Sequence, residues 1–339
     1  MNKTITALAI MMASFAANAS VLPETPVPFK SGTGAIDNDT VYIGLGSAGT
    51  AWYKLDTQAK DKKWKALAAF PGGPRDQATS AFIDGNLYVF GGIGKNSEGL
   101  TQVFNDVHKY NPKTNSWVKL MSHAPVGMAG HVTFVHNGKA YVTGGVNQNI
   151  FNGYFEDLNE AGKDQTAVDK INAHYFDKKA EDYFFNKFLL SFDPSTQQWS
   201  YAGESPWYGT AGAALVNKGD KTWLINGEAK PGLRTDAVFE LDFTGNNLKW
   251  NKLAPVSSPD GVAGGFAGVS NDSLIFAGGA GFKGSRENYQ NGKNYAHEGL
   301  KKSYSADIHL WHNGKWDKSG ELSQGRAYGV SLPWNNSLL

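Results

Sequence analysis

A pattern that recurs along the chain constrains its fold more than any other feature. In the clearest copy, a polar turn at Asp84-Gly85 leads into an apolar run that ends in the pair Gly91-Gly92, and a second run precedes Trp117. Copies that carry the tryptophan end at Trp64, Trp117, Trp199, Trp250 and Trp316. Such self-similarity indicates a repeat architecture, because one repeat cannot bury its apolar face alone.

The composition indicates that each repeat is made of strands. Glycine is abundant, with 40 residues, and aromatic residues make up 13% of the chain, while charged residues make up only 19%. Glycine-rich turns between short aromatic strands are typical of all-β folds. The pattern resembles the kelch-repeat family, in which each repeat forms one four-stranded antiparallel blade of a β-propeller. We therefore expect the tryptophans to pack between neighbouring blades.

A sixth copy begins near the C-terminus. The segment Gly325-Arg326-Ala327-Tyr328 repeats the segment Pro74-Arg75-Asp76-Gln77, which opens the clearest copy. The chain stops at Leu339, where a glycine pair is due. The fold predicted from the sequence is thus an all-β, six-bladed kelch propeller whose last blade is truncated. Residues 20–339 are expected to form this single domain.

The first residues predict export. Lys3, an apolar run over residues 5–15 and the small-residue pattern Ala17-Asn18-Ala19 together predict a signal peptide over residues 1–19, with cleavage before Ser20. The run is too short to span a bilayer of about 30 Å. Loss of Lys3 leaves acidic and basic residues balanced, so the mature form has no electrostatic reason to bind nucleic acid or membrane. A periplasmic location is expected.

Cysteine and histidine limit the chemistry. The absence of cysteine excludes disulfides, thiolate catalysis and cysteine metal sites. The eight histidines are scattered along the chain, so no metal site is expected.

Two repeats carry insertions, at about residues 147–185 and 281–302. Both follow a Gly pair or its equivalent directly. In a four-stranded up-and-down blade, the loop between strands two and three lies at the same end as the loop that enters strand one. Both insertions should therefore lie on one face, where we expect a central site. The helical candidate lies near residues 157–186.

The four arginines fall on this same face by the same argument. Planar guanidinium groups suit a carboxylate ligand, so we predict that they bind substrate. The alternative is that they join neighbouring blades by hydrogen bonds. The arginines are Arg75, Arg234, Arg286 and Arg326.

Glu228 is the strongest candidate for catalysis. It follows Asn226-Gly227, at a place where other copies carry Ile93, Val146 and Ala280. A carboxylate has thus replaced an apolar residue next to the axis, where it suits proton transfer. The alternative is a solvated loop residue.

Residues 226–234 and 278–286, together with the insertions, resemble the bacterial periplasmic N-acetylneuraminate epimerases, a family of sialic acid mutarotases. The resemblance implies conversion of the α-anomer of N-acetylneuraminic acid to the β-anomer by ring opening and reclosure, without a cofactor. In this family Glu228 would match the proton acceptor and Arg234 the residue that positions the substrate. A non-catalytic glycan-binding propeller, a lyase or hydrolase acting on acidic sugars, and assembly as a homodimer stay open at this point.

Overall fold

The computed structural model describes residues 22–245, 248–334 and 337–339. The predicted signal peptide and its cleavage site before Ser20 lie outside these residues. Within them, no helix is both long and apolar enough to cross a bilayer.

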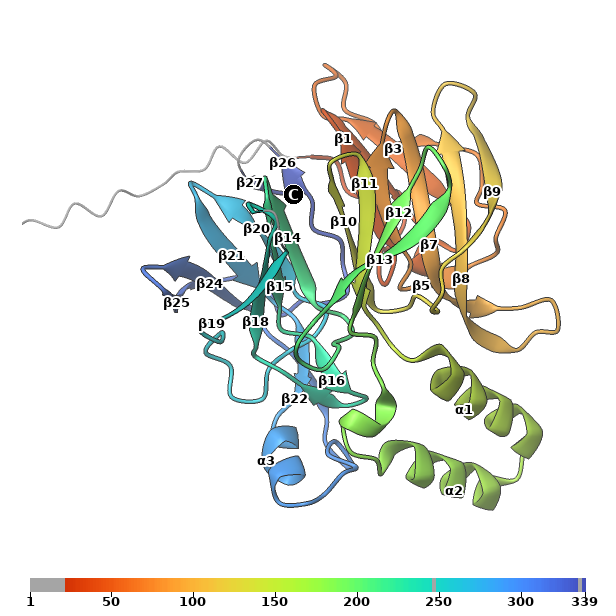
Figure 1. Cartoon of the computed structure of the whole chain (residues 1–339), viewed down its shortest axis with the longest axis vertical. Helices are drawn as coiled ribbons and strands as arrows, with labels where there is room; N and C mark the ends of the chain where they lie inside the picture. Colours follow the sequence, from red (N-terminus) through yellow and green to blue (C-terminus); the bar gives the residue numbers. More distant parts are fainter. Residues whose placement is uncertain (1–21, 246–247, 335–336) are drawn as a thin grey trace, which may run out of the picture.

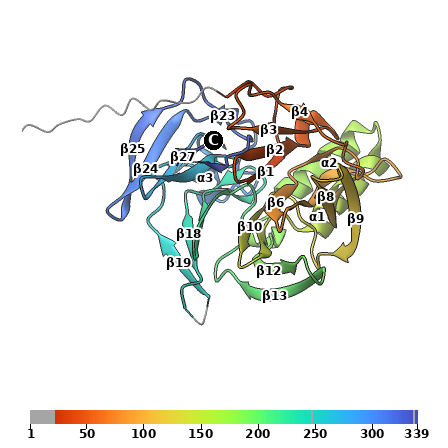
Figure 2. The same ribbon diagram turned by 90° about the horizontal axis from the view of Figure 1, so that it is seen from above.

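Five four-stranded antiparallel sheets follow one another along the chain and form blades around a common axis (Figures 1 and 2). The innermost strand of each blade lines the axis, and a short strand, β5 (Arg75–Asp76), adds to the second blade by pairing with the end of its second strand. The strands, from the axis outwards, are β1 (Thr33–Asp37), β2 (Thr40–Gly44), β3 (Trp52–Asp56) and β4 (Lys65–Ala66); β6 (Thr79–Ile83), β7 (Asn86–Lys95), β8 (Thr101–Asn111) and β9 (Ser116–His123); β10 (His131–His136), β11 (Lys139–Gly144), β12 (Phe188–Asp193) and β13 (Gln198–Glu204); β14 (Ala214–Lys218), β15 (Lys221–Ile225), β18 (Val238–Asp242) and β19 (Lys249–Leu253); and β20 (Phe266–Ser270), β21 (Ser273–Ala277), β24 (Asp307–His312) and β25 (Lys315–Glu321).

The prediction of six blades is wrong for the described residues, since the β-propeller has five. In the sixth position, between β20 and β1, the chain forms only a short hairpin of β26 (Pro333–Trp334) and β27 (Ser337–Leu338). Two backbone hydrogen bonds between Leu332 and Leu339, of 2.9 and 3.0 Å, close this hairpin. The sixth repeat therefore supplies two strands of two residues each, and these cannot form a four-stranded sheet.

The sixth repeat nevertheless takes part in a chain of backbone hydrogen bonds around the axis, which runs from Gln77 to Gly130. Six residues, each directly before a residue that lines the axial cavity, have φ between 55° and 66°. Five successive N–H to carbonyl hydrogen bonds of 2.7–2.8 Å join them one to the next. We call these residues the axial ring; they are Ser31, Gln77, Gly130, Gly212, Gly264 and Tyr328.

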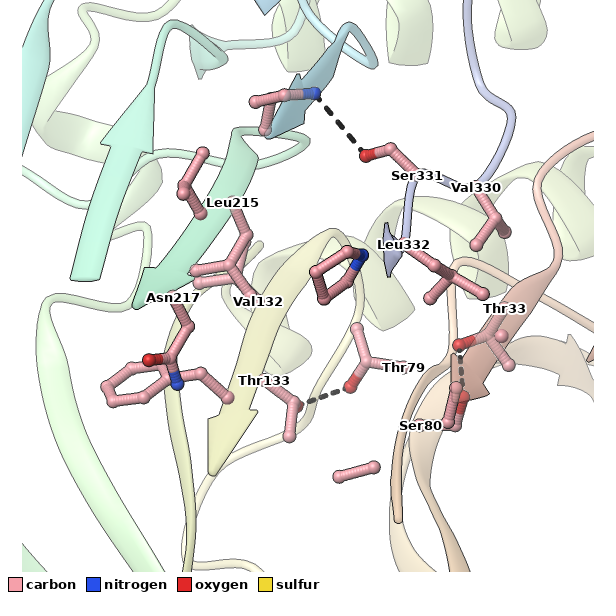
Figure 3. A pocket seen from close by; sticks show the side chains of 18 of the residues that line it. Thr33, Thr79, Ser80, Val132, Thr133, Leu215, Asn217, Val330, Ser331 and Leu332 are labelled. Carbon is pink, nitrogen blue, oxygen red and sulfur yellow. Dashed lines mark hydrogen bonds between the residues drawn. The ribbon is translucent and has the colours of Figure 1, made fainter. Parts of the chain in front are cut away.

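The axial ring lies at the mouth of a cavity of about 590 Å³ that the innermost strands enclose. Small and hydroxylated side chains line this cavity, and Thr33 and Ser80 share a hydrogen bond of 2.9 Å across two strands (Figure 3). The axial cavity is lined by apolar side chains as well, among them Val132, Leu215 and Leu332.

Tryptophans pack between blades, as the repeat pattern predicts. Trp117 of the second blade lies against Trp52 and Phe70, and its indole N–H donates to the carbonyl of Ala68 at 2.9 Å. The indoles of Trp64 and Trp316 likewise donate to backbone carbonyls, at 3.2 Å, whereas the buried N–H groups of Trp199 and Trp250 have no partner among the described residues.

Both insertions lie at one end of the propeller, as the blade geometry predicts (Figure 1). The first holds two helices rather than one, α1 (Gln148–Ala161) and α2 (Gln165–Phe176), followed by the short η2 (Glu181–Tyr183). Side chains of Asn147 and Asp164 cap the two helices by accepting from backbone N–H groups at 3.1 Å. The other elements at this end are β16 (Glu228–Lys230), β17 (Leu233–Arg234), β22 (Ala280–Phe282), β23 (Lys302–Tyr304) and α3 (Ser285–Gln290), while η1 (Gly46–Ala48) follows β2.

Comparison of a turn glycine, Gly85, with Gly91 of the glycine pair shows why the repeat needs that pair. Gly85 and Gly91 both have positive φ, of 74° and 57°, but a Cβ on Gly85 would meet nothing within 4 Å. A Cβ on Gly91 would lie 2.4 Å from the carbonyl oxygen of Met128.

We expect Gly85→Ala to lower the free energy of unfolding by about 1–2 kcal/mol, the cost of the left-handed conformation alone. Gly91→Ala should cost clearly more. Denaturant unfolding measures both, and equal losses would contradict the packing argument.

Candidate active site

A tight hairpin presents Glu228 at the axial face. β16 and β17 are joined by Lys230-Pro231-Gly232-Leu233, in which proline occupies the second position and Gly232, with φ of 81°, the third. This is the sequence preference of a type II turn. The register places Glu228 directly opposite Arg234.

The backbone of Glu228 is also bound to the entry of its own blade. Two hydrogen bonds of 2.8 and 2.9 Å join Glu228 and Ala211, which precedes Gly212 of the axial ring. In the next blade the same pair of bonds joins Ala280 and Ala263. Glu228 and Ala280 therefore occupy equivalent positions, which confirms that a carboxylate stands where another repeat carries an apolar residue.

The described residues hydrogen-bond to one carboxylate oxygen of Glu228. Oε1 accepts from the backbone N–H of Gly232 at 2.7 Å and forms an ion pair with the guanidinium of Arg234. Oε2 has no hydrogen bond to any described residue, and the side chain is 23% exposed. A carboxylate that is oriented through one oxygen and open through the other can accept a proton from a ligand.

Arg234 is buried behind this carboxylate. Its side chain is only 4% exposed, its Nε donates to the carbonyl of Ala280 at 3.3 Å, and its guanidinium lies 5.4 Å from the centre of the Phe282 ring. Burial raises the pKa of the Tyr328 hydroxyl, and the phenol lies close enough to Arg234 for the guanidinium to oppose part of this effect. The blade that carries Glu228, the next blade and the axial ring therefore meet at this guanidinium.

Lys230, which the sequence analysis did not single out, connects the hairpin to both insertions. Its buried ammonium donates to the carbonyl of Phe176 at 3.0 Å and to the carbonyls of Lys178 and Asn294. Burial lowers the pKa of Lys230 to about 8, although Asp177 acts in the opposite direction. In the sequence, the one hint of this role was the position of Lys230 between the two candidate site residues Glu228 and Arg234.

His297 of the second insertion covers the turn of the hairpin. It packs against Gly232 and against the rings of Phe282 and Tyr295. Burial lowers the pKa of His297 to about 4, and the neighbouring Glu228 offsets only part of this effect. The imidazole is therefore neutral at pH 7. No group of three or more potential metal ligands occurs among the described residues.

The other arginines are held in different surroundings. Arg75 is buried and its fork contacts both oxygens of Asp106, one of them at 2.9 Å, as well as the carbonyls of Gly72 and Gly91 at 3.0–3.3 Å. Burial alone raises the pKa of Asp106, but the hydrogen bonds and charge of Arg75 outweigh it, and the net pKa is lowered. These contacts are structural, but they hold Arg75 within the second blade and its entry rather than joining neighbouring blades.

Arg286 is paired with an aspartate of the described chain, whereas Arg326 is not. Arg286 contacts both oxygens of Asp236 at 3.1 Å and so holds α3 against the fourth blade. Arg326 is exposed, and its guanidinium has no partner among the described residues. Of the four arginines, the structure brings Arg234 to Glu228 and leaves Arg326 open to a ligand.

We expect Arg75→Lys to lower the free energy of unfolding by roughly 1.5–3 kcal/mol, because an ammonium cannot replace the bidentate fork on buried Asp106. Arg326→Lys, at an exposed site without a partner, should change it by less than about 0.5 kcal/mol. Denaturant unfolding measures both variants. Unchanged stability of Arg75→Lys combined with weaker ligand binding would instead restore the substrate-binding role predicted for Arg75.

Comparison with known proteins agrees with this geometry. The family described as N-acetylneuraminate epimerase matches residues 22–339. The N-acetylneuraminate epimerase of Escherichia coli (strain K12) is 98% identical over 339 residues, which cover 100% of this chain and 92% of that protein. That of Shigella flexneri serotype 5b (strain 8401) is 97% identical over the same shares of the two chains.

A solved structure is similar as well. The structure of YjhT superposes with a TM-score of 0.93 at 98% sequence identity, and the match covers 94% of this chain and 91% of that one. The family match spans both insertions and the hairpin that carries Glu228 and Arg234. The chain belongs to the N-acetylneuraminate epimerase family.

Proposed function

We propose that this protein is a mutarotase that converts the α-anomer of N-acetylneuraminic acid to the β-anomer. The family supplies the substrate and the class of reaction. The observation in this chain that carries the proposal is the carboxylate of Glu228, which Arg234 and Gly232 hold through one oxygen while the other oxygen stays open.

The reaction needs only proton transfers. Glu228 takes the proton of the anomeric hydroxyl, a second group protonates the ring oxygen, and the ring opens to the keto form. Rotation exposes the other face of the carbonyl carbon, and reclosure with the reverse transfers gives the other anomer. One positioned acid or base contributes roughly 10²–10⁴-fold to such a rate. The scheme requires no cofactor or metal.

Two arginines have distinct roles in this proposal. Arg234 orients Glu228 through one carboxylate oxygen, and its positive charge would lie next to the substrate carboxylate. Arg326 offers an open guanidinium on the same face. Arg75 and Arg286 were predicted as further substrate ligands, but their ion pairs with Asp106 and Asp236 favour a supporting role.

A periplasmic location is part of the proposal, and the N-terminal segment supports it. We expect the protein purified from a periplasmic extract to begin at Ser20, because the small-residue pattern Ala17-Asn18-Ala19 directs cleavage there. Mass spectrometry of the intact protein identifies the terminus. Protein that retains Met1 and stays with the cytoplasmic fraction would contradict export. The homodimer also stays a prediction, which the mass of the protein in solution tests.

Substitution of Glu228 tests the proposed base. Glu228→Gln keeps the size of the side chain but removes the proton acceptor, so we expect the rate of mutarotation to fall at least about 10²-fold while the fold is retained. Arg234→Lys keeps a charge but loses the planar fork. It should weaken substrate binding by about 1.5–3 kcal/mol, roughly a 10- to 100-fold rise in KM.

Proton NMR of freshly released α-anomer, after subtraction of the spontaneous rate, measures both variants. Glu204→Gln is the matched control, since Glu204 forms an exposed ion pair with Lys187 on an outer strand and should leave the rate unchanged. If Glu228→Gln is as fast as the parent, Glu228 is a structural residue. A parent that binds the sugar without accelerating mutarotation would favour the glycan-binding alternative.

A further inference from the structure

Tyr328 has a backbone conformation that is unusual for an aromatic residue. It belongs to the axial ring, in which half of the positions are glycine, and its φ is 63°. Its N–H donates to the carbonyl of Gly264 at 2.8 Å, and its carbonyl accepts from the N–H of Ser31 at 2.7 Å. Neighbours on both sides thus hold a large side chain in the left-handed region. Residues held in this way occur often at functional sites.

The ring of Tyr328 extends from the axial ring towards the hairpin that carries Glu228. It crosses directly over Gly264, where a Cβ would lie 2.5 Å from Cδ1 of the tyrosine, so only glycine admits it. It brings the phenol close enough to Arg234, the partner of Glu228, for the guanidinium to act on the pKa of the hydroxyl. A phenol and a carboxylate from different repeats therefore lie beside the same guanidinium.

Positive charge surrounds this phenol. The ammonium groups of Lys30 and Lys302, both exposed residues, lie 5.7 and 5.6 Å from the centre of the Tyr328 ring, and Arg234 lies near its hydroxyl. Burial raises the pKa of Tyr328 above its ordinary value, so the hydroxyl keeps its proton at neutral pH, while Arg234 acts in the opposite direction. The three cations can stabilise a phenolate that forms transiently.

We propose that Tyr328 is the second catalytic residue of this site and donates the proton that the sugar ring oxygen takes up when the ring opens. This inference rests on the proposed mutarotase function and identifies the acid that the mechanism requires. The alkoxide that leaves during ring opening is a far stronger base than a phenolate, so proton transfer from the phenol is downhill.

The proton balance closes over one cycle. As Glu228 removes the proton from the anomeric hydroxyl, the carbonyl double bond forms, the bond from the anomeric carbon to the ring oxygen breaks, and that oxygen takes the proton of Tyr328. The site then holds a protonated carboxyl and a phenolate. After rotation, the phenolate takes the proton back as the hydroxyl attacks the other face of the carbonyl, and Glu228 returns its proton to the carbonyl oxygen.

His297 is the rival donor at this site. Its Nδ1 is buried without a hydrogen-bond partner, and it lies near Glu228. With a pKa of about 4 the imidazole is neutral at pH 7, and a neutral imidazole releases its N–H proton far less readily than a phenol. Tyr328 is therefore the better acid of the two.

Tyr328→Phe removes the proton and leaves the ring. We expect kcat for mutarotation of the α-anomer of N-acetylneuraminic acid to fall about 10²-fold, with KM changed less than about 3-fold, by proton NMR. The double variant Glu228→Gln/Tyr328→Phe should be scarcely slower than Glu228→Gln alone, because acid and base act in one step. A merely structural role would give multiplicative losses. Tyr110→Phe is the matched control, since the buried hydroxyl of Tyr110 donates to Asn115 in the second blade, and its kcat should match the parent.

Three results overturn the inference. An unchanged kcat in Tyr328→Phe, alongside a parent that is active and lost activity in Glu228→Gln, removes Tyr328 while the proposed function stands. Loss of kcat in His297→Asn but not in Tyr328→Phe assigns the acid to His297. Multiplicative losses in the double variant give Tyr328 a packing role. A parent without mutarotase activity instead defeats the proposed function itself.

Discussion

Backbone hydrogen bonds around the axis fix the positions of Tyr328 and of the hairpin that carries Glu228. Each joins one repeat to the next, and the four inner residues of the chain that runs from Gln77 to Gly130 each donate to one neighbour and accept from the other. Gly212, for example, donates to Gly130 and accepts from Gly264. The residue before it, Ala211, is bound to Glu228 by two further bonds. The position of the proposed base is thus set by the contacts that hold the blades together.

Lys230 extends this constraint from the blades to the insertions. A buried ammonium is costly unless each of its donors is satisfied, and Lys230 has three donors and three carbonyl acceptors. One acceptor, Phe176, is the last residue of α2, where carbonyls lack partners within the helix and a positive charge is favourable. Lys230 therefore adds to the hydrogen bond between Ala180 and Tyr289 and to the stacking of Phe176 on Tyr295 in holding the hairpin and the two insertions together.

The sequence predicted the features that repeat and missed those that do not. Recurrence revealed the blades, the packing of Trp117 and the equivalence of Glu228 and Ala280. The prediction of six blades was wrong because the start of a sixth repeat reveals only its first strand, whereas a complete blade needs four strands. The sequence could not predict the ion pairs of Arg75 and Arg286, because the aspartates that pair with them lie 31 and 50 residues away along the chain. Tyr328 aligns with Gln77 in the repeat, but only the structure shows that its ring crosses a glycine to reach Arg234.

The carboxylates paired with arginines show why one of them is suited to catalysis. Asp106 and Asp236 each use both oxygens on the fork of an arginine, an arrangement that leaves no oxygen for a ligand. Glu228 instead shares a single oxygen between Arg234 and the N–H of Gly232. The tight turn makes the difference, because it brings a backbone donor to the same oxygen. The result is a carboxylate that is held through one oxygen and has no hydrogen bond from the described residues at the other, as suits a general base.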